Sequence, residues 1–216
     1  KRENPSSFEQ RVQIYGSAAI RQYGHTKEML MSKIVAGMTL SLDGFVNDSS
    51  GSVAALYSDF ESFRDSEPLR ETIQNTGAVV MGRNAYAMAE DPDWFAYNYE
   101  FQVPIFVVTH EIPAKKPKET DQLTFTFVTD GVESAILQAK TAAGGKDVTV
   151  IGGASTLRQC LQAGLADELH IDIMPVLLYG GLRLFEDLGM APVQLERLDV
   201  VILPSGRTHF KFRVVK

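Results

Sequence analysis

The sequence predicts an α/β protein with a mostly parallel central sheet that finishes in an antiparallel hairpin. Short apolar stretches alternate with segments of helical periodicity along most of the chain, which is the pattern of successive β-α units. Two of these stretches run directly into glycine and then into a helix, at Gly82 and at Gly152-Gly153. Near the C-terminus, two strand-like stretches flank Pro204-Ser205-Gly206-Arg207, a typical hairpin turn.

Each element follows from its local pattern. After the first strand, Leu56, Phe60 and Phe63 recur at helical spacing, with a break at Pro68. The second strand is nearly all apolar, as expected of a strand covered on both faces. The expected strands, in chain order, are 34–40, 78–81, 104–109, 125–128, 148–151, 168–174, 193–203 and 208–215. The expected helices are 56–73, 85–89, 132–142 and 154–163.

The chain has 216 residues, which fits one domain with an extension. Residues 31–216 are expected to form the domain, because the alternating pattern begins just after Met31. Residues 1–30 carry a weak helical pattern that Gly16 and Gly24 interrupt. We interpret this extension as a leader, a tag or a dimerisation arm.

Composition excludes several classes of function. The net charge is −6 and no basic block occurs, so nucleic acid is not an expected partner. The single cysteine, Cys160, rules out an internal disulfide and indicates a reducing, cytoplasmic compartment. The four histidines lack ligand spacing, so no metal site is expected. No apolar run reaches the ~18 residues that a membrane span needs.

The strongest candidate for a binding site is the strand-turn-helix unit around Gly152 and Gly153. Glycines let a ligand approach the backbone, and the following helix start presents unpaired N–H groups and a positive dipole end. Together these features suit a pyrophosphate, to which Ala154, Ser155 and Thr156 add N–H and hydroxyl donors. The alternative is a tight turn that simply requires glycine, since the G-x-G-x-x-G fingerprint is absent.

Two other strand ends carry similar features. Gly82 and Arg83 follow the second strand and begin a helix, and Thr109 and His110 end the third. An arginine at such a position can pair with a phosphate; the alternative, which the residue taken alone favours, is a solvated helix-start arginine. Strand ends of a parallel sheet meet at one edge, where open α/β sheets bind ligands. Their convergence favours a dinucleotide site.

At these residues the sequence resembles the dihydrofolate reductase-like family, and more closely the reductase (C-terminal) domain of the riboflavin-biosynthesis deaminase-reductase. The resemblance covers about Lys33 to Lys216 and implies a three-layer dihydrofolate reductase-like fold. The matching segments, in family order, are Thr39-Leu40-Ser41-Leu42-Asp43-Gly44, Val80-Met81-Gly82-Arg83, Val150-Ile151-Gly152-Gly153-Ala154, Asp167-Glu168-Leu169-His170, Pro175-Val176-Leu177-Leu178, Gly180-Gly181 and Leu184-Phe185.

The resemblance implies NADPH as the cofactor and assigns positions to it. Gly82 and Arg83 would lie along the phosphates, and Thr109 near the adenosine 2′-phosphate. Gly152 to Thr156 would hold the pyrophosphate, and the backbone of Leu40 would lie near the nicotinamide.

The sequence also departs from the family pattern. Dihydrofolate reductases commonly carry threonine where this chain has Ala85. They also place an acidic residue on the first helix to grip the pteridine; Asp59 and Glu61 lie near that region, but neither is a clear match. Riboflavin reductases often carry glutamate, which contacts the substrate, where this chain has Ile151.

Asp43 and Trp94 are further candidates for substrate contact. Asp43 either orients the substrate and relays a proton or is a turn aspartate before Gly44. Trp94 opens an aromatic-rich stretch that either walls a flat substrate by stacking or is a packed loop or dimer surface. His170 and His209 are interpreted as structural.

The sequence therefore predicts an NADPH-dependent reductase that transfers a hydride to a small heterocycle, pterin- or pyrimidine-like. The alternative is a nucleotide-binding or sensor module on the same fold, without turnover. The family commonly pairs its subunits, so a homodimer is expected.

Overall fold

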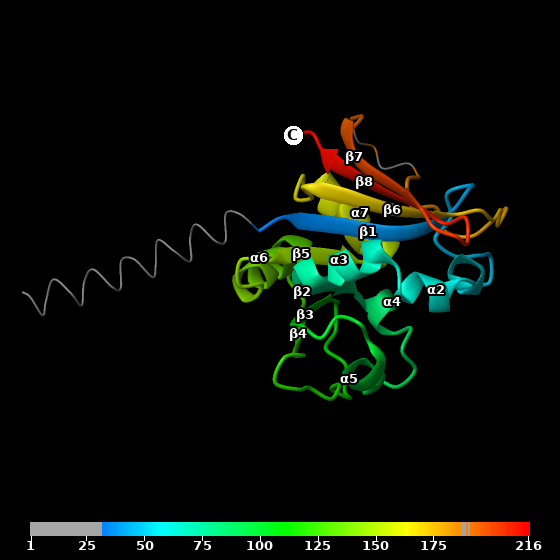
Figure 1. Ribbon diagram of the computed structural model, residues 1–216. Coiled ribbons are helices and arrows are strands. Elements are labelled where there is room, and N and C mark those ends of the chain that lie inside the picture. The colour runs from blue at the N-terminus through cyan, green and yellow to red at the C-terminus, as the bar shows by residue number, and fades with distance from the viewer. Residues whose placement is uncertain (1–31, 187–188, 190) are drawn as a thin grey trace, which may run out of the picture.

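The computed structural model describes residues 32–186, 189 and 191–216. These residues form one eight-stranded sheet in the order β4-β3-β2-β5-β1-β6-β8-β7 (Figure 1). The strands are β1 (Ile34–Ser41), β2 (Thr76–Gly82), β3 (Ile105–Val108), β4 (Phe125–Val128), β5 (Asp147–Ile151), β6 (Glu168–Met174), β7 (Leu195–Ile202) and β8 (Thr208–Val214). The expected extension at residues 1–30 lies outside the described residues.

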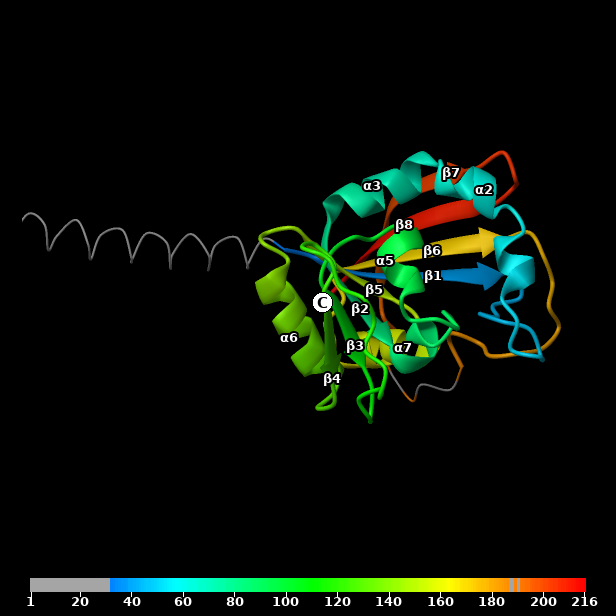
Figure 2. The same ribbon diagram turned by 90° about the horizontal axis from the view of Figure 1, so that it is seen from below.

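Helices cover both faces of the sheet, which gives three layers (Figure 2). The helices α6 (Val132–Ala142) and α7 (Ala154–Gln162) lie on one face. The other face is covered by the shorter elements η1 (Ala54–Tyr57), α2 (Phe60–Arg64), α3 (Glu67–Asn75), α4 (Arg83–Tyr86) and α5 (Trp94–Asn98). None of the helices in the described part of the chain is long and apolar enough to cross a membrane.

The central strand β2 shows why the sheet is covered on both sides. Ala78 and Val80 pack into the core beneath α6 and α7, whereas Val79 and Met81 pack into the core on the opposite face. All four residues are buried, because strand side chains alternate between the two faces. The nearly all-apolar stretch 78–81 is therefore confirmed as an interior strand.

The mostly parallel sheet and the antiparallel C-terminal hairpin are both confirmed. Strands β1 to β6 pair in parallel, and β8 pairs antiparallel to both β6 and β7. The turn between β7 and β8 closes with a hydrogen bond from Gly206 N–H to the Leu203 carbonyl at 2.9 Å. Gly206 has a φ of 87°, a conformation that favours glycine.

The helical elements before β3 differ from the expectation. The region 56–73 divides into η1, α2 and α3, because the Ser66 hydroxyl caps a new helix at Leu69 N–H and Pro68 lies in its first turn. The helix expected at 85–89 instead begins at Arg83. The short helix α5, within the aromatic stretch, was not predicted from the sequence.

Candidate functional site

One cavity of about 790 Å³ lies at the carboxyl ends of β2, β3 and β5 and extends along the middle of β1. Its nucleotide half is lined by the glycine turns of β2 and β5 and by the starts of α6 and α7. Its inner half is lined by side chains from β1, β6 and β8 and by aromatic residues of η1 and α2.

The two glycine turns predicted from the sequence meet directly. Gly82 N–H donates to the Gly152 carbonyl at 2.9 Å, which joins the ends of β2 and β5. Gly82 packs so closely that a Cβ there would lie 2.3 Å from Oγ1 of Thr156. The expected convergence of these two strand ends is therefore confirmed.

The start of α7 faces this junction without a side-chain cap. Gly153 is the N-cap residue and the helix begins at Ala154. Gly152 has a φ of 50°, and the Gly152–Gly153 peptide bond is cis. The first N–H groups of a helix lack partners within it, so this uncapped start leaves donors facing the cavity.

Other predicted residues of the nucleotide half also line the cavity. Arg83 is exposed and makes no ion pair with any residue that the structure describes. Thr109 is buried, and its hydroxyl donates to the Glu111 carbonyl at 2.8 Å. Thr129 and Gly131, before α6, complete this half and were missed because no apolar or charged motif marks them.

Three predicted site residues lie outside the cavity lining, namely Leu40, Trp94 and Asp43. The Leu40 side chain is buried in the core beneath α7. Trp94 is 44% exposed and its ring contacts Phe95 and Tyr99. Ile151, by contrast, lines the cavity as expected.

Asp43, which also lies outside the cavity lining, joins two loops. Its carboxylate accepts hydrogen bonds from the backbone N–H groups of Leu178 at 3.1 Å and Tyr179 at 2.8 Å. Arg183 Nη1 also donates to the Asp43 carbonyl at 3.1 Å. A hydrogen bond from the Ser41 side chain, together with these backbone bonds, lowers the pKa of Asp43 to about 2. This geometry fits the turn-aspartate alternative, because the carboxylate oxygens are occupied.

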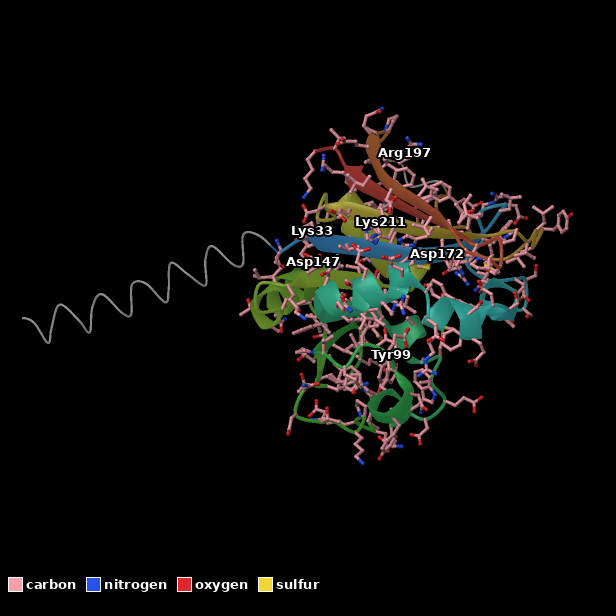
Figure 3. The ribbon with its side chains drawn as sticks, in the orientation of Figure 1. Lys33, Tyr99, Asp147, Asp172, Arg197 and Lys211 are labelled. Atoms are coloured by element: carbon pink, nitrogen blue, oxygen red, sulfur yellow. The ribbon has the colours of Figure 1, made fainter. Side chains whose placement is uncertain are left out.

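The inner half contains a polar row across three strands. The sheet register places Thr39 beside Asp172 and Asp172 opposite His209. Nδ1 of His209 lies 2.9 Å from Oδ1 of Asp172, and all three residues line the cavity. The buried Nε2 of His209 has no hydrogen-bond partner among the described residues. Figure 3 labels Asp172 on β6, on the side of the sheet that α2 and α3 cover.

Sequence reasoning missed this row. His170 and His209 were interpreted as structural, and both line the cavity. Strand pairing between β6 and β8 creates the contact with Asp172, and a single sequence does not encode that pairing locally. The period-2 alternation in 168–174 was the available signal, since it places polar residues on one face.

The protein-family comparison fits this arrangement of strands and site. The family model described as the RibD C-terminal domain matches residues 32–206. The chain belongs to the RibD C-terminal domain family. The resemblance drawn from the sequence motifs is thereby confirmed. A relative from Bacillus subtilis (strain 168), the uncharacterized protein YyaP, is 23% identical over 192 residues, covering 84% of this chain and 94% of YyaP.

Solved structures similar to this RibD C-terminal domain protein support the fold. A putative riboflavin biosynthesis protein from Shewanella sp. PV-4 superposes with a TM-score of 0.69 and 21% identity, covering 85% of this chain and 99% of that one. Dihydrofolate reductase from Enterococcus faecalis, complexed with NADP(H) and RAB-propyl, gives a TM-score of 0.55 and 13% identity, covering 85% and 97%. The dihydrofolate reductase-like three-layer fold is therefore confirmed.

Proposed function

We propose that this protein is an NADPH-dependent reductase of a small heterocyclic substrate, pterin- or pyrimidine-like. The observation that carries the proposal is the uncapped start of α7, which opens beside the Gly82 and Gly152–Gly153 turns onto the cavity. Such a helix start suits a pyrophosphate because its N–H groups and its dipole both favour anions. Family membership and the NADP(H)-bound structural relative support the same conclusion.

The residues of the nucleotide half fit a dinucleotide. A cavity of about 790 Å³ is within the ~300–1,000 Å³ range of ligand pockets. Gly152 to Thr156 would hold the pyrophosphate, and the exposed Arg83 would pair with a phosphate. Thr109 would lie near the adenosine 2′-phosphate. When bound, the cofactor supplies a hydride from its nicotinamide ring.

The inner half supports a substrate beside that ring. Tyr57, Phe60 and Phe63 give it flat apolar walls, and the polar row gives it hydrogen-bonding groups. Aromatic walls with a few directed polar groups are typical of sites for heterocycles. The chain would thus orient the substrate against the cofactor and exclude water around it.

A nucleotide-binding or sensor module without turnover is the second candidate. Two observations favour it: Ala85 lacks the hydroxyl expected at the phosphates, and the Asp43 carboxylate is engaged by backbone N–H groups. Under this alternative NADPH binds, but no heterocycle is reduced.

Cofactor binding and turnover can be measured separately. NADPH fluorescence should change on titration with the protein, and NADPH absorbance should fall in the presence of a panel of pterins, aminopyrimidines and quinones. Absence of binding at millimolar NADPH would contradict both candidates. Binding without oxidation across the panel would favour the module.

The exposed edge of the sheet supports a homodimer as the assembled state. Among the described residues, strand β7 pairs on one side only. It exposes Leu195, Leu198, Val200 and Ile202, the last at 74%. An apolar edge strand invites pairing with another chain. Sedimentation equilibrium should therefore give twice the monomer mass, and Ile202→Lys should shift the chain toward monomer.

A further inference from the structure

We infer that the inner half of the cavity selects an unphosphorylated heterocycle whose donor-rich edge binds Asp172 and His209. This inference rests on the proposed function and names the substrate class for the same site. It depends on three features of the inner half: the polar row, the distribution of charge around it, and the aromatic walls.

The polar row offers hydrogen-bonding capacity that the protein leaves unused. Oδ1 of Asp172 is bonded to His209 Nδ1, but no described residue bonds to Oδ2 of Asp172 or to Nε2 of His209. The side chain of Asp172 is 14% exposed and that of His209 is 6% exposed. Buried polar atoms normally have partners, so a ligand with N–H groups would complete this pair.

The charged residues around this row are mostly acidic. Asp172 and Glu100 line the inner half, and burial raises the pKa of the Glu100 carboxyl. Among the described residues that line the whole cavity, Arg83 is the one lysine or arginine, and it lies in the nucleotide half. A phosphate in the inner half would therefore lie beside the Asp172 carboxylate, and no described lysine or arginine lines that half to pair with it.

Three cations near this part of the sheet are already paired. Arg207, which is fully buried, donates from Nε and Nη2 to Asp59, from Nη2 to the Leu56 carbonyl and from Nη1 to Thr39. Lys211 Nζ lies 2.5 Å from Glu71 and Lys33 Nζ lies 2.9 Å from Glu168 (Figure 3). None of these three cations lines the cavity.

The walls set the shape of the ligand. Tyr57, Phe60, Phe63 and Phe101 line the inner half from η1, α2 and the segment before β3. Aromatic rings favour a flat partner that stacks or packs edge to face. A flat ring with amino and ring N–H groups on one edge satisfies both the walls and the polar row.

Calorimetry with two matched probes tests the inference on the full chain loaded with NADP⁺. The probes are 5,6-diaminouracil and 5-amino-6-(5-phosphoribosylamino)uracil, which differ in the ribose phosphate. The diaminouracil should bind at least about tenfold more tightly than the phosphorylated probe. Its amino group can donate to the Asp172 carboxylate, and it carries no phosphate for that carboxylate to repel. Equal binding, tighter binding of the phosphorylated probe, or no binding of either would overturn the inference.

Variants assign the effect to the pair. Asp172→Asn and His209→Gln should each weaken diaminouracil binding about tenfold, and Asp172→Asn should also reduce discrimination against the phosphorylated probe. Arg213→Gln is the matched control, because Arg213 lies on the same strand in an exposed ion pair with Glu196. The ring nitrogen resonances of His209 should shift when diaminouracil binds. If they stay in place while other resonances of the cavity move, the assignment is wrong.

Failure of this inference can be separated from failure of the proposed function. If NADP⁺ binds and neither probe does, the cofactor site stands and the substrate class is wrong. If NADP⁺ does not bind, the proposed function fails, and the two probes are compared on the cofactor-free protein with the same expected preference.

Discussion

Arg207 and Asp59 form a buried ion pair that joins the C-terminal hairpin to the start of α2. Nη2 of Arg207 lies 2.5 Å from Oδ1 of Asp59, and Nε lies 3.0 Å from Oδ2. The guanidinium also stacks over Phe63, with 4.1 Å between its carbon and the ring centroid. The hydrogen bonds from Arg207 lower the pKa of Asp59. Asp59, which lies near the region where dihydrofolate reductases carry their acidic residue, is thereby committed to Arg207.

Breaking this pair should destabilise the protein strongly. Arg207→Gln leaves the Asp59 carboxylate buried without its cation, which typically costs about 3–5 kcal/mol. Arg213→Gln removes an exposed pair on the same strand and should cost under about 1 kcal/mol. Urea unfolding of both variants measures the difference. Similar free energies of unfolding for the two would show that the Arg207 pair is not important for stability.

A side chain at Gly153 should weaken NADPH binding. Gly153→Val places a β-branched side chain at the uncapped start of α7, where the pyrophosphate would approach. The backbone at Gly153 is extended, and a Cβ there would approach Asn84 no closer than 3.9 Å, so the fold should be retained. We expect a loss of affinity of about tenfold or more, measured by fluorescence titration. Ala163→Val, at the exposed far end of α7, is the control. Unchanged NADPH affinity in Gly153→Val would show that Gly152-Gly153 is a structural turn and not a binding site.

The contribution of Asp43 to the stability of the fold should be lost at acidic pH. Its folded-state pKa is about 2, below the ordinary 3.8, so its carboxylate stabilises the fold above pH 3.8 and loses this effect as pH falls toward 2. Asp43→Asn should lower the melting temperature at neutral pH, and the gap from the wild type should close across that window. Asp121→Asn, at an exposed loop position, should show no such gap. A gap that stays constant down to pH 2 would contradict the assignment.

Cys160 should be unreactive in the native protein. The thiol is fully buried on α7, and burial raises its pKa to about 12. Because the thiolate is the reactive form, iodoacetamide should label it slowly in buffer and rapidly in denaturant. Mass spectrometry of the single-cysteine chain gives both rates. Fast labelling of the folded protein would place the thiol near the surface.

The sheet and the nucleotide half were largely predictable from the sequence. All eight strands were expected, because apolar runs such as 78–81 and the Pro204–Arg207 turn are local signals. The meeting of Gly82 with Gly152 was expected from a general rule, since the carboxyl ends of parallel strands share one edge. The substrate, cofactor and dimer assignments stay predictions.

The inner half was not predictable from the sequence, because long-range pairing creates it. Thr39, Asp172 and His209 come from three strands, and only the register of β1, β6 and β8 sets them side by side. Trp94 and Leu40 show the reverse case. Trp94 begins the short helix α5, which no sequence pattern predicted, and Leu40 lies within β1 with its side chain toward the core, so the structure places both residues outside the cavity lining.

The two halves of the cavity draw on the chain in different ways. The strand ends and helix starts of the nucleotide half come from one continuous stretch, 82–156, whereas the inner half combines β1 with the C-terminal hairpin. His209 comes from that hairpin, and so does Arg207, which holds α2 through Asp59. Substitutions in the hairpin should therefore alter recognition of the second ligand and leave the residues of the dinucleotide cradle in place.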